Sequence, residues 1–338
     1  MTSTPVRIGC LGAARIAPTA LVKPARHSIA AKVAAVAARD RSRAEAFAAR
    51  HSIPKVYGSY QELVEAPDVE AVYVPLPNGL HAEWTLAALA AGKHVLCEKP
   101  FTANAGEAER VAAAATASNL VVMEAFHWRY HPLAARLLEI VGGDELGPIE
   151  RIEATMIFPL PNRSDIRWQL DLAGGSLMDA GCYPVHIVRT LAGAEPVVTS
   201  AVCKERTPGV DRWIRGELSF ADGRTGRVTA GMWSSTVVRT QARVTGRRGT
   251  LTVINPVAPQ FFNLITIRGP KRTRRFRVGG RPTYEYQLEA FVSAIRQGTP
   301  TLTGPADSVA NMKTIDSLYR AAGLEIRRGR SEAARNAG

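Results

Sequence analysis

The chain has 338 residues, of which 46% are hydrophobic and 22% are charged, and its formal net charge is +13. This length favours two domains over one, because a single core seldom organises so many residues. No apolar run is long enough to span a bilayer, and the first residues lack the basic and apolar segments of a signal peptide. We therefore expect a cytoplasmic protein with no membrane partner. The 4 cysteines form neither a C-x-x-C pair nor a group with spaced histidines, so we expect no metal site.

The positive charge gathers in two segments, at residues 269–281 and 325–336. A nucleic-acid-binding protein would explain such a charge. However, the sequence has no zinc-finger spacing, no basic helix with heptads, and no paired aromatic residues of the kind that an RNA-binding sheet carries. Basic side chains also protect the exposed edge of a sheet. We therefore interpret the two segments as an edge strand and a solvated terminus, and we expect no nucleic-acid partner.

The first part of the sequence alternates between short apolar runs and helical patterns. Runs at 6–12, 31–40, 69–77, 93–100 and 120–126 have the composition of buried strands, and segments 43–51, 80–92 and 104–119 that of helices. Strands that alternate with helices at this spacing form a parallel sheet with crossover helices. We therefore predict an α/β domain with a parallel sheet over residues 1–123.

The rhythm changes after Glu124. Helices are predicted over 131–141 and around Asp179–Leu191, and extended runs separated by turn signals such as A-D-G-R and G-R-R-G lie between 147 and 279. Two helical patterns, 284–298 and 307–323, follow these runs. These features predict an α+β domain with a large, mostly antiparallel open sheet over residues 124–338.

The stretch G-C-L-G-A-A-R-I-A-P, residues 9–18, follows the first predicted strand and opens a helix. In a dinucleotide-binding fold this turn reads G-x-G-x-x-G, and here the three positions hold Gly12, Ala14 and Ala17. The first glycine makes the tight turn, and a small third residue lets helix and strand pack closely. Alanine at the second position adds one methyl group near the phosphates. The turn therefore predicts that residues 1–123 form an α/β Rossmann dinucleotide-binding domain, with cofactor contacts by Gly12, Ala14, Arg15 and Ile16.

The end of the second predicted strand decides which dinucleotide we expect. An NAD enzyme places an acidic residue there to bind the ribose hydroxyls. Here the position falls on Ala38 and is followed by Arg39, whose guanidinium matches the geometry of a 2′-phosphate. Asp40 lies two positions after the place of the expected acid. We therefore expect NADP with Arg39 at its phosphate; the alternative is that Arg39 is a solvated loop residue.

Lys99 precedes a proline at the end of a further predicted strand, at the edge where open α/β sheets bind ligands. Three blocks, G-A-A-R-I-A, P-L-P-N-G-L-H with the following C-E-K-P, and G-G-S-L-M-D-A-G-C-Y-P-V-H, together resemble the glucose–fructose oxidoreductase, inositol dehydrogenase and MocA-like family. The resemblance covers nearly the whole chain. The chain most resembles the NADP-dependent branch that contains dihydrodiol dehydrogenases and pyranose dehydrogenases. This resemblance implies an oxidoreductase that acts on CH–OH donors.

The resemblance also implies site residues. Lys99 would contact the reacting hydroxyl or carbonyl, Asp179 would orient the pair or hold a substrate hydroxyl, and Tyr183 would carry the proton. A nearby ammonium favours the phenolate, so a tyrosine beside a lysine is a coherent acid–base unit. For Asp179 the alternative is a carboxylate that caps the following helix. Further cofactor contacts are implied at Pro77, Asn78, His81, Glu98 and Lys99.

His186 competes with Tyr183 for the role of proton carrier. Inositol dehydrogenase-like members carry histidine at the position of Tyr183, so this chain resembles the tyrosine branch. On a continuous helix Asp179, Tyr183 and His186 would share one face. Pro184, however, fits best in the first turn of a helix, which would leave Asp179 ahead of that helix. We assign the proton to Tyr183 and expect His186 to pack behind it.

Aromatic side chains in the segments that the resemblance places around the cleft are candidates for the pocket wall, because aromatic rings stack on the C–H face of a sugar or on an arene diol. Each of them, taken alone, is more typical of a core. The predicted substrate-binding residues are Lys99, Trp128, Arg129, Phe158, Trp168, Asp179, Tyr183, His186 and Trp233.

We therefore predict an NADP-dependent oxidoreductase that transfers a hydride between nicotinamide and a secondary alcohol or ketone of a sugar or related cyclic polyol. The alternatives are a 3-ketoreductase of a nucleotide-linked keto-sugar, a trans-dihydrodiol dehydrogenase, and a sensor that binds NADP without turnover. We also expect a homodimer or higher homo-oligomer formed through the open face of the second sheet. The residues that suggest an apolar surface there are Phe220, Val228, Ala230 and Met232.

Overall fold

The computed structural model describes residues 4–329 and divides them into two compact units. The first unit contains the chain up to His127 together with Tyr284–Val309, and the second contains Trp128–Thr283 and Ala310–Arg328. The outer ends of the two predicted domains, and the last part of the basic terminus, lie outside the described residues. Within these residues no helix is both long enough and apolar enough to cross a membrane.

The first unit is built on a six-stranded sheet in which all paired strands run parallel, with the order β3-β2-β1-β4-β5-β6. The strand order reverses between β1 and β4, and open α/β sheets bind ligands outside the carboxyl ends of the strands at such a reversal. The strands are β1 (Val6–Leu11), β2 (Ala31–Ala37), β3 (Lys55–Tyr57), β4 (Ala71–Val74), β5 (His94–Cys97) and β6 (Val122–Glu124).

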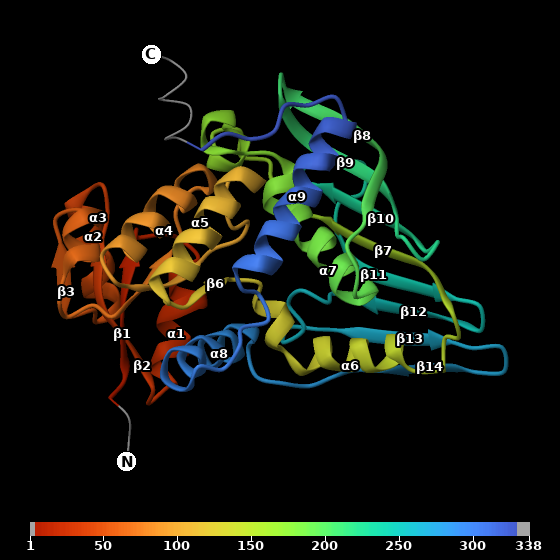
Figure 1. Ribbon diagram of the computed structural model, residues 1–338, viewed down its shortest axis with the longest axis horizontal. Helices are drawn as coiled ribbons and strands as arrows, with labels where there is room; N and C mark the ends of the chain where they lie inside the picture. The colour runs from red at the N-terminus through yellow and green to blue at the C-terminus, as the bar shows by residue number, and fades with distance from the viewer. Residues whose placement is uncertain (1–3, 330–338) are drawn as a thin grey trace. The chain divides into compact units, whose positions relative to one another are not determined.

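Side chains at the helix ends explain where the helices of this unit begin. Asp40 and Asn104 accept hydrogen bonds from the first turns of α2 and α5, and such caps stabilise a helix start. Figure 1 shows α4 and α5 side by side against the sheet. The helices are α1 (Lys23–Arg26), α2 (Arg41–His51), α3 (Tyr60–Glu65), α4 (His81–Ala90), α5 (Ala105–Ser118) and α8 (Thr283–Gln297).

The division of the chain differs from the expected domains in two respects. The boundary falls after residue 127 rather than after residue 123, and nearly all of α8 belongs to the first unit although it follows the second sheet in sequence. A hydrogen bond and an ion pair hold α8 in the first unit. Glu285 lies 2.8 Å from His27 at the end of α1, and Arg296 pairs with Glu70 just before β4. Periodicity predicts the helix itself but carries no information about these distant partners.

The second unit contains an eight-stranded sheet with the order β14-β13-β12-β11-β7-β10-β9-β8. Its strands pair in the antiparallel direction except for β7 and β10, which are parallel, so the predicted mostly antiparallel sheet is confirmed. The strands are β7 (Ile149–Ile157), β8 (Val197–Thr207), β9 (Val210–Ser219), β10 (Thr225–Gly231), β11 (Arg239–Gly246), β12 (Gly249–Ile254), β13 (Leu264–Arg268) and β14 (Thr273–Phe276).

Helices cover one face of this sheet: α6 (Pro132–Gly142), α7 (Cys182–Ala192) and α9 (Pro305–Ala321), the last of which begins in the first unit (Figure 1). The packing is close, since a Cβ added to Gly216 of β9 would lie 2.1 Å from the side chain of Leu318 in α9. The four residues taken as an apolar open face are instead at most 5% exposed and belong to the core, so that interpretation was wrong: Phe220, Val228, Ala230 and Met232. Alternation shows which residues share a face, but not which face the helices cover.

The opposite face of the sheet is polar. Glu217 of β9 pairs with Arg151 of β7 (2.9 Å) and Arg227 of β10 (2.6 Å), and Glu153 lies 3.2 Å from Arg151. Threonine and arginine side chains continue the surface over β11 to β13, for example Arg243, Thr252 and Thr266. A homo-oligomer formed through this sheet stays a prediction, and its interface would have to match a charged surface.

Candidate active site

A tight turn follows β1 and leads into the first helix. Gly12 has a φ of 109°, in the region that favours glycine. Its N–H donates to the carbonyl of Ala37 at the end of β2 (2.7 Å). Ala17 is fully buried, so the third motif position needs a small side chain. A strand, a left-handed glycine and a helix start in this order fit a bound pyrophosphate. The other predicted residues of the turn are half-buried or exposed: Ala14, Arg15 and Ile16.

The end of β2 presents an arginine and not a carboxylate. Ala38 is buried and Arg39 is exposed. The carboxylate of Asp40 is engaged as the N-cap of α2, where it accepts hydrogen bonds from the N–H groups of Ser42 (2.9 Å) and Arg43 (3.3 Å). Hydrogen bonds from these two residues lower the pKa of Asp40. The nearest acidic side chain therefore serves its own helix, which leaves Arg39 as the group suited to a 2′-phosphate.

Tyr60, the first residue of α3, completes this corner of the first unit. Its hydroxyl lies 3.7 Å from the position that a Cβ on Gly12 would take. Burial raises the pKa of the phenol, and the nearby charges of Arg39 and Arg43 oppose the rise. The ring also packs edge-on against Trp84, with the ring centroids 5.1 Å apart. Sequence patterns did not identify Tyr60, because β3 and α3 are too short to give a periodic signal.

His81 joins the loops that follow β4 and β5. The ring is fully buried, with Nδ1 2.7 Å from the carbonyl oxygen of Pro100 and Nε2 2.8 Å from that of Leu76. Burial lowers the pKa of His81 to about 4, so the ring is neutral near pH 7 and carries one N–H donor. Pro77 and Asn78, in the loop between Leu76 and His81, are half-buried. His81 therefore lies between the two loops and donates to only one of these carbonyl oxygens, and its predicted cofactor contact stays a prediction.

Glu98 and Lys99 follow β5. The carboxylate of Glu98 is buried and accepts hydrogen bonds from the Tyr73 hydroxyl (2.6 Å) and the Lys99 N–H (3.3 Å). Lys99 is half-buried. Burial, and to a smaller extent the charge of Lys99, lowers the pKa of His127 to about 3. The His127 ring also packs on Tyr284, with centroids 4.1 Å apart. Tyr284 was not among the predicted site residues, since its position depends on the return of α8.

In the second unit the helical stretch that carries Asp179 and Tyr183 begins earlier than expected. A π-helical turn, Leu177–Gly181, runs directly into α7. Pro184 lies in the first turn of α7 and Asp179 precedes that helix, as expected, but Asp179 already belongs to the π turn that leads into it. Such π turns are rare and occur mostly as single turns within longer helices.

Asp179 forms an ion pair, and the first N–H of the helical stretch bonds to a different carboxylate. Its Oδ2 lies 3.0 Å from Nε of Arg167, whose pKa rises chiefly because of this carboxylate. The N–H of Leu177 at the start of the helix donates instead to Asp211 of β9 (2.7 Å). Tyr183 is 4% exposed and lies four residues after Asp179. Residues at this spacing share one face of a helix, so the position of this helical stretch sets the direction of both side chains.

His186 packs against a tryptophan. Its Nδ1 accepts a hydrogen bond from Nε1 of Trp128 (3.1 Å), and the two rings meet edge-on with centroids 5.5 Å apart. An accepting Nδ1 leaves the proton of the neutral ring on Nε2. This contact gives His186 a packing role and supports the assignment of the proton to Tyr183, which stays a prediction.

The predicted aromatic wall divides into exposed and buried members. Phe158 and Trp233 follow the parallel strands β7 and β10, so they lie at the same edge of the sheet. Trp233 is 48% exposed, whereas Trp128 and Trp168 are 1% and 6% exposed. The guanidinium of Arg206 lies 4.5 Å from the ring centre of Trp168. Phe158 and Trp233 are therefore the rings that offer surface to a ligand, and Arg129 is half-buried.

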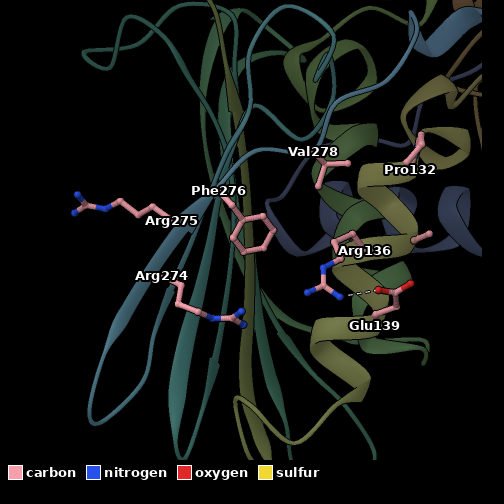
Figure 2. Close-up of a pocket in the computed structure, with 8 residues that line it drawn as sticks. Pro132, Arg136, Glu139, Arg274, Arg275, Phe276 and Val278 are labelled. Carbon is pink, nitrogen blue, oxygen red and sulfur yellow. Dashed lines mark hydrogen bonds and ion pairs between the residues drawn. The ribbon is translucent and has the colours of Figure 1, made fainter.

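A separate groove of about 800 Å³ lies between α6 and β14 (Figure 2). Phe276 projects toward α6, where Arg136 pairs with Glu139 (2.8 Å). Arg274 also lines the groove, and its charge is matched by Glu145. The lining includes none of the predicted cofactor, substrate or catalytic residues, so we do not place the reaction there. In the described part of the chain, no group of three or more His, Cys, Asp and Glu side chains is arranged to hold a metal ion.

Two family models match the chain. One, described as an oxidoreductase family with an NAD-binding Rossmann fold, matches residues 6–126, and the GFO/IDH/MocA C-terminal domain matches residues 134–252. The chain is 36% identical to D-xylose 1-dehydrogenase (NADP(+)) 2 of Haloferax volcanii, over 93% of this chain and 96% of that protein. It is also 36% identical to trans-1,2-dihydrobenzene-1,2-diol dehydrogenase of Sus scrofa, over 67% of each chain.

Solved structures of oxidoreductases have a similar fold over nearly the whole chain. A 3-ketoreductase from Actinomadura kijaniata, in complex with NADP and TDP-benzene, superimposes with a TM-score of 0.89 at 30% identity, over 95% of this chain and 99% of that one. Other structures of that enzyme contain a replaced tyrosine or a replaced lysine. An aldose–aldose oxidoreductase from Caulobacter crescentus, in complex with glycerol, has a TM-score of 0.86 at 25% identity, over 94% and 98% of the two chains.

Proposed function

The chain belongs to the GFO/IDH/MocA oxidoreductase family, and we propose that it transfers a hydride between NADP and a hydroxyl- or keto-bearing ring carbon of a sugar or related cyclic polyol. The comparisons confirm the predicted oxidoreductase class, the NADP cofactor and the dihydrodiol dehydrogenase branch. The observation that supports the proposal is that Tyr60 lies beside both Gly12 and Arg39 at the carboxyl ends of β1 and β2. The chain also has a lysine after β5 and a tyrosine in α7.

The first unit offers groups for each part of the cofactor. The turn from Gly12 to Ile16 would take the pyrophosphate, Arg39 the 2′-phosphate, and the loop with Pro77 and Asn78 the nicotinamide ribose. Bound NADP supplies the two-electron hydride chemistry that side chains lack. The role of the protein is then to bind, to orient and to move a proton.

The acid–base work falls to two side chains in this proposal. When a hydride leaves an alcohol carbon, negative charge develops on its oxygen, and the ammonium of Lys99 would stabilise that charge. The hydroxyl of Tyr183 would take the proton during oxidation and return it during reduction. Asp179, held by Arg167, would receive a neighbouring substrate hydroxyl. Phe158 and Trp233 would offer apolar faces to the ring of the substrate.

A second candidate is the reduction of a keto-sugar carried on a nucleotide. The similarity to the 3-ketoreductase favours it, with a TM-score of 0.89 over 95% of this chain, as does the net charge of +13, which would attract a diphosphate. We rank a free sugar first, because the xylose dehydrogenase is 36% identical over 315 residues, whereas the curated dTDP-3,4-didehydro-2,6-dideoxy-alpha-D-glucose 3-reductase of Actinomadura kijaniata is 32% identical over 318 residues. An arene diol is the third substrate class to test.

The experiment is a panel of substrates, and the change in NADPH absorbance measures the turnover of each one. Free pyranoses such as D-xylose and D-glucose, and a trans-dihydrodiol, are supplied with NADP⁺ or NAD⁺, and a TDP-linked keto-sugar is supplied with NADPH. We expect turnover with a free pyranose and a preference for NADP⁺. Turnover of the TDP-sugar alone would support the second candidate. Tight NADPH binding with no turnover of any class would contradict the proposal and indicate a sensor.

A further inference from the structure

A buried ion pair lies outside the residues discussed so far as catalytic. Asp211, the second residue of β9, and Arg327, which follows α9, are 0% and 1% exposed and lie 2.8 Å apart. The Tyr319 hydroxyl donates to the same carboxylate oxygen as Arg327 (3.0 Å). Burial raises the pKa of Asp211, and the charge of Arg327 is the largest influence opposing the rise. Because desolvation of both charges offsets much of their attraction, such a pair adds little net stability.

The pair holds the segment that leads into α7, the helix that contains Tyr183. The second carboxylate oxygen of Asp211 accepts the N–H of Leu177 and the hydroxyl of Ser176, each at 2.7 Å. Arg327 donates from Nε to the carbonyl of Gly174 (2.8 Å). Leu177 is the first residue of the helical stretch, so a carboxylate from another strand satisfies its backbone donor. The segment after α9 is thus held against the start of β9 and the loop that contains Gly174.

The paired glycines of the G-G-x-x-x-D-x-G block are shaped to this arrangement. Gly175 has a φ of 133°, and a Cβ there would lie 2.2 Å from Oδ1 of Asp211 and 2.8 Å from Arg327. A Cβ on Gly174 would lie 2.6 Å from the carbonyl oxygen of Arg167, the partner of Asp179. Both glycines therefore allow the ion pair and the Arg167 segment to approach the same short loop.

We propose that Asp211 and Arg327 are positioning residues, which fix the loop Gly174–Leu177 and through it the directions of Asp179 and Tyr183. The inference rests on the proposed function for its consequence in catalysis. Asp179 and Tyr183 lie two and six residues after Leu177, so a change in the first turn moves both side chains. A displacement of about 1 Å in a reacting group is enough to cost roughly a hundredfold in rate.

The kinetic test compares Arg327→Met and Asp211→Asn with Arg189→Met. Arg189 is the matched control, because it is a buried arginine at the other end of α7 and pairs with Glu195 (2.7 Å). We expect kcat to fall about 10- to 100-fold in the first two variants, with the Kd for NADPH unchanged, and to stay near the wild-type value in the control. Arg327→Lys restores the charge but not the bond to Gly174, so it should recover only part of kcat.

A double variant separates positioning from simple loss of stability. Arg327→Met combined with Asp211→Asn removes both buried charges, so the melting temperature should recover relative to Arg327→Met alone. The positioning role predicts that kcat stays low in the double variant, because Gly174 has lost its guanidinium donor and an amide offers one acceptor oxygen where the carboxylate of Asp211 uses two. If kcat recovers together with the melting temperature, or if it falls equally in Arg189→Met, the proposal is overturned.

Hydrogen–deuterium exchange provides a readout that does not need the reaction. In Arg327→Met and Asp211→Asn we expect the amides of Leu177–Gly181 to exchange at least about tenfold faster than in the wild type, and to be unchanged in Arg189→Met. Unchanged exchange in this turn would overturn the proposal even if the variants lose activity. If the wild type turns over no sugar but the turn exchanges faster in both variants, the proposed function fails while the structural role of the pair stands.

Discussion

Replacing Arg39 with alanine should weaken NADPH binding selectively. Arg39 follows the buried Ala38 at the end of β2, where a carboxylate would otherwise read the ribose of NAD. A hydrogen bond between charged groups contributes about 1.5–3 kcal/mol. Because Arg39 is exposed, solvent screening favours the lower end of this range, which corresponds to about a tenfold rise in the Kd for NADPH. The Kd for NADH, which lacks the phosphate, should change little.

Asp40→Ala is the matched control in this assay. The carboxylate caps α2 through Ser42 and Arg43, so its loss should lower the free energy of unfolding without altering the ratio of the two Kd values. Isothermal titration with NADPH and NADH measures both constants directly. If Arg39→Ala weakens both cofactors equally, or if Asp40→Ala changes the binding of NADH selectively, the assignment of the 2′-phosphate to Arg39 is refuted.

Two further predictions concern charges in the first unit. A hydrogen bond from Arg296 lowers the pKa of Glu70, so their pair stabilises the fold above the unfolded pKa of about 4.3 and loses this effect as the pH falls through the lowered value. Arg296→Gln should therefore be less stable than the wild type by about 1 kcal/mol near pH 7 and equally stable in acid, as measured by urea unfolding at several pH values; a difference independent of pH would contradict this. Because burial lowers the pKa of His127 to about 3, its ring resonances should stay constant between about pH 5 and 8 in NMR spectra, and a titration in that range would show that the ring is hydrated.

The sequence was sufficient to predict the elements that have a strong pattern. Alternating apolar runs and helical segments predicted the parallel sheet, and turn signals between extended runs predicted the antiparallel one; both are present. The exceptions are short. β3 (Lys55–Tyr57) and α3 (Tyr60–Glu65) contain too few residues for a period to be visible, and Tyr60 was missed with them.

Contacts between distant residues could not be predicted from local patterns. Asp211 and Arg327 are 116 positions apart, and only the fold brings them to Gly175. The same limit applies to the face of the second sheet, because alternation places Val228 and Ala230 together without showing that helices cover them. The candidate site was predictable where a motif fixes local geometry, as in the turn at Gly12, and not where partners come from other elements.

The proton carrier is the central claim, and Tyr183→Phe tests it most directly. This variant keeps the buried ring and removes the hydroxyl, so the fold and the Kd for NADPH should be unchanged. With the sugar identified in the substrate panel, we expect kcat to fall about 10²- to 10⁴-fold, the usual effect of removing a general acid or base. His186→Asn, which removes a ring that packs on Trp128, should keep most of its turnover. If Tyr183→Phe keeps most of its turnover while His186→Asn loses it, the proton belongs to His186 and the account is contradicted.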